Sequence, residues 1–249
     1  MNRRELRIIM TITFLVVVYV VSYMASEYIV VNSKNADIKG KKYDYTIIID
    51  PGHGGMDPGK VGVNGKFEKD INLQIAEKLK KNFLKNKDLN IKVVMTREED
   101  KGLYNQNEKN KKISDMENRC KIINENKGDI LVSIHQNSYQ SGGAKGAQIF
   151  YYSGSEKGRN LASSIQKSIN DRLFEGMGRT EKDNSNYYIL LNVNCPAVIV
   201  ECGFLSNSQE ADLLSDEEYQ KKMADAIESG VYEYFEKLKG KYEEPESHG

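Results

Sequence analysis

The chain has 249 residues, and its 36 basic and 36 acidic side chains leave it without net charge at neutral pH. Because there is no basic excess, we do not expect a nucleic acid as a partner. Apolar residues make up 39% of the chain, which is enough to fill a core in a protein of this length.

Residues 1–25 have the pattern of a membrane-targeting segment. Three arginines precede an apolar run from Ile8 to Ala25, which as a helix would be about 27 Å long and would nearly span the hydrocarbon core of a bilayer. The basic flank is expected to stay in the cytoplasm, so the rest of the chain would be exported. Tyr23 stands where a cleavage site requires a small residue, which favours an uncleaved anchor over a cleaved signal peptide.

Two polar segments flank the rest of the sequence. Residues 26–44 form a linker rich in Lys and Asn, and residues 239–249 form a charged tail that contains His248. Neither segment has enough apolar side chains to order itself. We therefore predict a disordered tail in which His248 is not a ligand, and one domain over residues 45–238.

Strand and helix patterns alternate through residues 45–238. Continuous apolar runs predict buried strands, and apolar residues at four-residue spacing predict helices with one face in the core. The predicted strands are 46–50, 91–95, 130–134, 147–152 and 197–200. The predicted helices contain 71–83, 116–124, 161–173 and 219–235. This alternation predicts a single α/β domain with a mostly parallel or mixed central sheet flanked by helices.

Two capping-box patterns suggest where helices begin. Ser114 is followed three residues later by Glu117, and Ser153 is followed by Glu156. In such a pair the serine side chain accepts a hydrogen bond from the first helical turn, and the glutamate bonds back to the serine backbone. We therefore expect helices to be introduced by these two serines.

The three cysteines offer no obvious metal site or disulfide framework. Cys120, Cys195 and Cys202 are odd in number and widely separated. We expect them to act as small buried apolar residues.

Two of the three histidines follow predicted strands. His53 lies in the glycine-rich segment DPGHGG, and His135 follows the apolar run ILVSI. Parallel sheets place their functional sites at the carboxyl ends of strands, and imidazole is the commonest side-chain ligand of metals. A lone histidine at position 135 is more often a core residue. Two histidines with one carboxylate, however, make a common catalytic zinc site, so both histidines are candidate metal ligands.

Two glutamates are candidates to complete this site. Glu68 stands at the predicted start of a helix, where a carboxylate also stabilises the amide-rich helix end, so on its own it is better explained as a surface residue. Glu201 follows the apolar strand AVIV. A charged side chain at that position needs a partner, a metal ion or a catalytic role.

Taken together, these motifs resemble the zinc-dependent N-acetylmuramoyl-L-alanine amidases of the type 3 family. The segments DPGHGGMDPG, FEKDINL, SIHQNS and PAVIVECGFLSN occur in the order, and at about the separations, found in that family. The resemblance covers about residues 45–238. It implies that Zn²⁺ is held by His53, Glu68 and His135, and that Glu201 is the catalytic glutamate.

Two arginines also match positions of the family. Arg97 lies in VVMTREED and Arg119 lies in ENRCKIIN. The resemblance implies that these side chains either support the structure or orient the substrate.

The resemblance implies hydrolysis of the amide between N-acetylmuramic acid and the L-alanine of the peptidoglycan stem peptide, on the outer face of a membrane or in the cell wall. Within the family, the short domain behind an N-terminal segment is most similar to the germination-specific cortex amidases of endospore formers, whose action leads to muramic δ-lactam. A vegetative autolysin of the same family is the alternative. We see no long insertion that would serve as an inhibitory helix, so any regulation is expected to come from an exported activator protein.

Two other classes of protein share some of these features. The residues Gly54, Gly59 and Lys60 nearly form a phosphate-binding loop, but Val61 stands where Ser or Thr should hold magnesium, and Pro58 removes a backbone amide. A non-catalytic peptidoglycan-binding domain would be indicated by loss of a ligand or of the catalytic glutamate. All four residues are present, so the sequence favours the enzyme.

Overall fold

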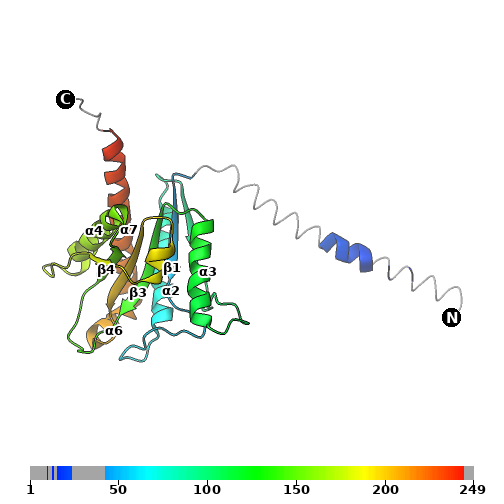
Figure 1. The fold of residues 1–249 in the computed structure, drawn as a ribbon, viewed down its shortest axis with the longest axis horizontal. Coiled ribbons are helices and arrows are strands. Elements are labelled where there is room, and N and C mark those ends of the chain that lie inside the picture. The colour runs from blue at the N-terminus through cyan, green and yellow to red at the C-terminus, as the bar shows by residue number, and fades with distance from the viewer. Residues whose placement is uncertain (1–9, 11–12, 14–15, 24–42, 244–249) are drawn as a thin grey trace. The chain divides into compact units, whose positions relative to one another are not determined.

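The structure is a computed structural model, and it describes residues 10, 13, 16–23 and 43–243 (Figure 1). The chain divides into two units, Met1–Tyr43 and Asp44–Gly249. In the part of the chain that the structure describes, no helix is long and apolar enough to cross a membrane. Most of the anchor predicted in residues 1–25, and nearly all of the linker predicted in residues 26–44, lie outside the described residues.

The second unit is a single α/β domain, as predicted, with helices on both faces of a mixed sheet. Its strands are β1 (Tyr45–Pro51), β2 (Ile91–Met95), β3 (Ile130–Asn137), β4 (Gln148–Tyr152), β5 (Lys182–Asn184) and β6 (Ala197–Phe204). Its helices are α2 (Glu68–Lys85), α3 (Lys111–Glu125), α4 (Glu156–Leu173), α5 (Tyr188–Asn192), α6 (Ser208–Leu214) and α7 (Glu217–Glu243).

The strand order across the sheet is β2-β1-β3-β6-β4-β5. The first four of these strands are parallel to one another, whereas β4 pairs antiparallel with β6, and β5 pairs parallel with β4. The carboxyl ends of β1, β3 and β6 therefore lie side by side at one edge of the sheet, with β3 in the middle. This arrangement brings together the segments that follow these strands.

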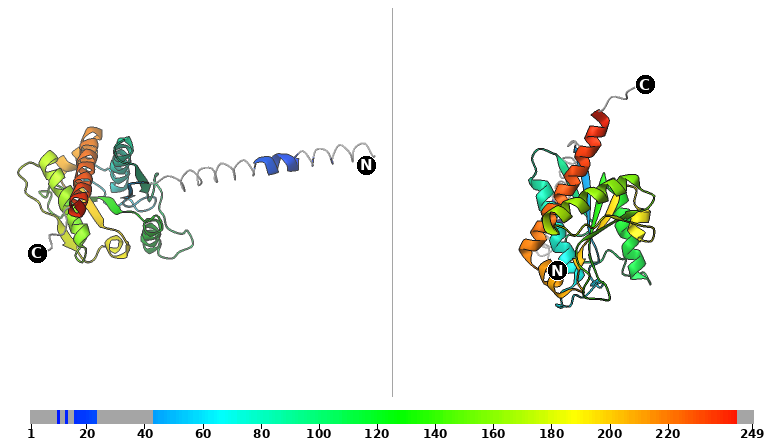
Figure 2. Two further views of the ribbon diagram at one scale, coloured as in Figure 1. Left: turned by 90° about the horizontal axis from the view of Figure 1, so that it is seen from above. Right: turned by 90° about the vertical axis from the view of Figure 1, so that its left-hand side faces the viewer.

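The two faces of the sheet bury two separate apolar clusters. Alternate residues of β1 point to opposite faces: Ile47 and Ile49 pack with α2, α4 and α7, whereas Ile48 packs with α3 and α5. Figure 2 shows α4 and α7 crossing each other on one side of the sheet. Because the central strands are covered on both faces, their sequences are continuous apolar runs rather than alternating ones.

The helices α3 and α4 do not begin as the capping boxes predicted. Asn110 caps α3, and its side chain accepts a hydrogen bond from the backbone N–H of Ile113 at 3.2 Å. Ser155 caps α4 by accepting from Gly158 at 3.0 Å. Ser114 is instead buried inside α3, where its hydroxyl accepts from the backbone of Asn105. The predictions at Ser114 and Ser153 were wrong because polar residues a few positions upstream or downstream cap equally well.

Other differences concern short or polar elements. The strand β5 consists of the polar residues KDN, and α5 and α6 are too short to show a helical period. At the other end of the domain, α7 continues to Glu243, past the boundary drawn at residue 238, and residues 244–249 lie outside the described part.

Candidate metal and catalytic site

The predicted site residues lie around the carboxyl ends of β1, β3 and β6. His135 of β3 and Glu201 of β6 are register partners in adjacent parallel strands. Pairing between these strands becomes irregular directly after His135. His53 follows the end of β1 by two residues, and Glu68 is the first residue of α2. Four segments far apart in the sequence thus contribute one side chain each.

The turn that carries His53 requires glycine on both sides. His53 itself has a φ of 62°, and Gly54 follows with a φ of 131°. A Cβ atom at Gly52 would lie 2.2 Å from Cε1 of His135, and one at Gly59 would lie 2.6 Å from Oε2 of Glu68. The glycines therefore allow the backbone to pass directly beside the histidine and glutamate side chains.

Two buried arginines hold this turn through its carbonyl groups. Arg97 donates to the carbonyl oxygens of Pro51 and Gly52, both at 2.9 Å. Arg119 donates to the carbonyl oxygen of Pro51 at 2.8 Å and to that of His53 at 2.5 Å. Both arginines thus contact the backbone that presents His53.

Asp50 compensates the charge of Arg119. Its carboxylate accepts from Arg119 at 2.6 Å, from the Thr96 hydroxyl at 2.6 Å and from the Ser133 hydroxyl at 2.7 Å. Burial alone would raise the pKa of Asp50, but the arginine charge and the two hydroxyl donors outweigh burial and lower the pKa to about 2. Asp50 is therefore a buried anion that ties β1, β3 and α3 together beneath the site.

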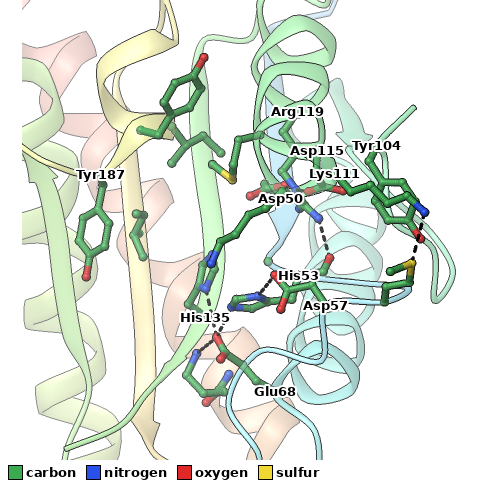
Figure 3. Close-up of a pocket in the computed structure, with 18 of the residues that line it drawn as sticks. Asp50, His53, Asp57, Glu68, Tyr104, Lys111, Asp115, Arg119, His135 and Tyr187 are labelled. Atoms are coloured by element: carbon green, nitrogen blue, oxygen red, sulfur yellow. Dashed lines mark hydrogen bonds and ion pairs between the residues drawn. The ribbon is translucent and has the colours of Figure 1, made fainter. Parts of the chain in front are cut away.

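The side chains of His53, Glu68 and His135 converge on one point (Figure 3). Oε1 of Glu68 lies 3.2 Å from Nε2 of His53 and 3.1 Å from Nδ1 of His135. One potential ligand atom from each residue lies within 4.8 Å of the other two. Two imidazole nitrogens and one carboxylate oxygen at this spacing can hold a metal ion.

Glu68 is part of the site and not a surface residue. Its side chain is buried, with 4% of the residue exposed. Its two carboxylate oxygens accept hydrogen bonds from the backbone N–H groups of Lys60 at 2.8 Å and Gln136 at 3.1 Å. Burial opposes the charge of Glu68, but the two histidines more than offset it, so the pKa of Glu68 is lowered. The position at the first turn of α2 is thus explained by the cluster as well as by the helix dipole.

Asp57 fixes the orientation of the His53 ring. Its Oδ2 lies 2.8 Å from Nδ1 of His53, which leaves Nε2 directed at Glu68. A carboxylate on the far ring nitrogen is the usual outer partner of a metal-binding histidine. Asp57 stands four residues after His53 in the DPGHGGMDPG segment, and sequence reasoning did not assign it a role. The i,i+4 spacing within a glycine-rich turn was the signal that was missed.

Glu201 lies beside the cluster without joining it. Oε2 of its carboxylate is buried and finds no hydrogen-bond partner among the described residues. Burial raises the pKa of Glu201 to about 7, against the lowering effect of His135. A buried carboxyl group with an unused oxygen and a pKa near neutrality is typical of a group that exchanges protons during a reaction.

A cavity of about 580 Å³ opens over these four residues. On one side it is lined by Tyr104, Lys111 and Lys112, and on the other by Tyr187, Tyr188 and Ile189. Figure 3 shows Tyr187 on the opposite side of His135 from Lys111 and Tyr104. None of these wall residues was predicted from the sequence, because they come from loops and helix starts without a recognisable motif.

The geometry is unfavourable to phosphate binding in the turn after β1. The backbone N–H of Gly59 donates to Oδ1 of Asp57 at 3.1 Å, and the backbone N–H of Lys60 donates to Glu68. A phosphate-binding loop needs such amides for its ligand. Here they already hold carboxylates of the protein, so the resemblance to a nucleotide-binding loop has no structural support.

The chain matches a known protein family. A family model described as N-acetylmuramoyl-L-alanine amidase matches residues 47–233. The germination-specific N-acetylmuramoyl-L-alanine amidase of Bacillus subtilis is 38% identical over 193 residues, which cover 76% of this chain and 79% of that protein.

Solved structures of similar sequence share the fold. The CwlD amidase of Clostridioides difficile, in a complex with the GerS lipoprotein, has a TM-score of 0.74 and 36% identity, and the match covers 78% of this chain and 99% of that one. A crystal structure of N-acetylmuramoyl-L-alanine amidase from Clostridium difficile 630 has a TM-score of 0.68 and 33% identity over 78% and 98% of the two chains. By its motifs, its fold and these matches, the chain belongs to the type 3 N-acetylmuramoyl-L-alanine amidase family of cell-wall amidases.

Proposed function

We propose that the chain is a zinc enzyme in which His53, Glu68 and His135 hold the metal and Glu201 transfers the proton. The observation that carries this proposal is the convergence of two imidazoles and a carboxylate next to a buried glutamate with an unused oxygen. Three protein ligands with an open fourth position are characteristic of catalytic zinc rather than structural zinc. A zinc ion bound there would supply Lewis-acid chemistry, activating water and polarising the amide carbonyl between muramic acid and L-alanine.

Side chains and backbone groups of the protein would orient the metal ligands and transfer the proton of the attacking water. Asp57 holds Nδ1 of His53, and the backbone amides of Lys60 and Gln136 hold the carboxylate of Glu68, so both ligands are positioned by hydrogen bonds. Glu201 would accept a proton from the attacking water and donate it to the departing amine of alanine. A pKa of about 7 suits both directions of transfer near neutral pH.

The test is hydrolysis of peptidoglycan by the purified full-length chain in detergent, with zinc content measured on the same samples. We expect new free amino groups on L-alanine, together with about one zinc ion per chain. A variant with all three ligands changed to alanine should lose both zinc and hydrolysis. Hydrolysis that persists in a zinc-free triple variant would disprove the proposed centre.

We propose further that the biological substrate is spore cortex, where hydrolysis precedes formation of muramic δ-lactam. The 38% identity with a germination-specific amidase supports this setting over a vegetative autolysin. Deleting the gene should remove muramic δ-lactam from spore cortex and leave vegetative growth and cell separation unchanged. Chained vegetative cells with normal cortex would instead identify an autolysin.

We also propose that residues 1–25 anchor the enzyme outside the cytoplasm and that an exported protein acts as its activator. A peptidoglycan substrate requires export, and the similar CwlD amidase was solved in a complex with a lipoprotein, which supports a protein partner. Fractionation should place the full chain in membranes with its domain accessible to external protease. A soluble form beginning near Ala25 would contradict the anchor. Hydrolysis by the purified chain that does not increase when exported proteins of the same cell are added would contradict the activator.

A further inference from the structure

The two walls of the cavity differ in charge. On one wall, Lys111 and Lys112 begin α3, and Tyr104 lies beside them in the preceding loop. The opposite wall, formed by Tyr187, Tyr188 and Ile189, has no charged side chain. The residues that could hold the metal lie between the two walls. A substrate cleaved there would therefore place its two halves against unlike surfaces.

The two lysines have no carboxylate partner within the part of the chain that the structure describes. Nζ of Lys111 lies 5.3 Å from the centre of the Tyr104 ring, 3.4 Å from Oε1 of Gln106 and 3.7 Å from Sδ of Met56. All three contacts are neutral. Lys112 is exposed, and its charge contributes to lowering the pKa of Asp57 without a direct ion pair.

The acidic residues near this wall have partners other than the two lysines. Asp115 pairs with Nε of Arg119 at 2.6 Å, and Asp50 pairs with Nη1 of the same arginine at 2.6 Å. Asp57 pairs with His53 and accepts from the backbone of Gly59. Lys111 and Lys112 therefore form no direct ion pair within the described residues, and their ammonium groups at the cavity favour an anionic group of the ligand.

We propose that the Lys111–Lys112 wall is a subsite for the glutamyl α-carboxylate of the stem peptide, and that it sets which way the substrate lies across the site. This inference rests on the proposed amidase function. The scissile amide joins a muramoyl group, which carries no free carboxylate once the amide is formed, to a peptide that has free carboxylates beyond its L-alanine. The wall formed by Lys111 and Lys112 thus contacts the peptide. The opposite, uncharged wall contacts the sugar, whose apolar ring face packs on a tyrosine side chain.

Two tripeptides distinguish binding of the carboxylate charge from binding of the rest of the peptide. The probe is L-alanyl-γ-D-glutamyl-L-lysine, and its comparison is the same peptide with the glutamyl α-carboxylate converted to an amide. Binding is measured by titration calorimetry on the zinc-loaded, full-length chain. The free acid should bind roughly threefold to tenfold more tightly than the amide, and this preference should shrink at high salt.

The variants assign the preference to the two lysines. The double variant Lys111→Met with Lys112→Met should bind acid and amide equally, whereas Lys111→Arg with Lys112→Arg should keep the preference. Lys121→Met is the matched control, because Lys121 lies on the same helix but is exposed and is not among the residues that line the cavity. It should behave as the wild type does.

The outcomes separate this subsite from the amidase function. Equal binding of acid and amide by the wild type, or a preference that survives the double methionine variant, would overturn the subsite even if peptidoglycan is hydrolysed. An acid preference that depends on the lysines, found in a chain that does not hydrolyse peptidoglycan, would retain the subsite and reject the proposed function.

Discussion

Glu201 of β6 lies directly across from His135 of β3 in parallel register, and both side chains face the same cavity. The register places a buried carboxyl group next to a candidate metal ligand without a hydrogen bond between them. The two glutamates of the site differ in their contacts. Glu68 contacts both histidines, whereas one carboxylate oxygen of Glu201 has no hydrogen-bond partner in the part of the chain that the structure describes. We therefore expect Glu68 and Glu201 to have separate roles.

The first prediction concerns Glu201. Glu201→Gln keeps the size of the side chain but cannot accept a proton, so we expect kcat to fall by roughly a hundred- to ten-thousand-fold with little change in KM or zinc content. Steady-state kinetics on a defined muropeptide, with metal analysis, checks this. Glu125→Gln, an exposed change on α3, is the control. Near-normal turnover would remove Glu201 from the mechanism, and loss of zinc would make it a ligand.

The second prediction concerns the ligands. His53→Ala, Glu68→Ala and His135→Ala should each lower zinc occupancy and abolish hydrolysis, because a site with three protein ligands has none to spare. Elemental analysis after dialysis provides the measurement. His248→Ala should change neither quantity. Full zinc in all three single variants would show that the metal, if required, is held elsewhere.

The third prediction tests the close approach at Gly52. A Cβ atom there would meet three atoms of the His135 ring at 2.2, 2.3 and 2.7 Å, so Gly52→Ala should displace the ring and weaken zinc binding. Gly143→Ala is the control, because nothing lies within 4 Å of a Cβ at that position. Competition with a chromogenic chelator measures both affinities. Equal zinc affinity in the two variants would mean that the ring moves without cost to the site.

The long central strands were predictable because burial on both faces makes β1, β3 and β6 continuous apolar runs, whereas the ends of several elements were not. The residues His53, Glu68, His135 and Glu201 were found because they stand in segments with a recognisable order. The walls of the cavity were not predictable in this way. Tyr104, Lys111 and Tyr187 line one cavity only through tertiary packing, and their neighbours in sequence show neither a period nor a motif.

The same limit applies to the groups beneath the site. Asp50 ends an apolar strand, as Glu201 does, yet the structure pairs it with Arg119, Thr96 and Ser133, from three separate segments. From sequence alone, a carboxylate that is paired in the fold, as Asp50 is, cannot be distinguished from one with an unpaired oxygen, as in Glu201. The distinction depends on which side chains arrive from elsewhere in the chain.

The fourth prediction concerns Asp57, which holds the His53 ring. Asp57→Asn keeps an oxygen acceptor but removes the charge, and outer partners of this kind contribute roughly tenfold to a hundredfold to metal affinity. We therefore expect weaker zinc binding with an intact fold, measured by the same chelator competition and by circular dichroism. Asp212→Asn, a change within α6 and outside the cavity, should leave zinc affinity unchanged. An unchanged affinity in Asp57→Asn would show that the charge of Asp57 does not contribute to zinc binding.

The fifth prediction links Asp50 to the dependence of stability on pH. Because the pKa of Asp50 is lowered in the fold from 3.8 to about 2, the folded state binds its proton less tightly than the unfolded state does. Its ionisation therefore stabilises the metal-free domain above pH 3.8, by about 2 kcal/mol, and this contribution is lost as the pH falls from 3.8 through about 2. Asp50→Asn should lower the free energy of unfolding by at least that much near pH 7, since it also leaves Arg119 buried beside an uncharged group.

Urea unfolding of the metal-free wild type and variant should show the largest difference in the free energy of unfolding at neutral pH and a smaller one toward pH 2. Asp171→Asn, an exposed pair with Lys167, should give a difference near zero at every pH. If the Asp50→Asn difference does not shrink on acidification, the carboxylate charge is not what stabilises the turn that carries His53.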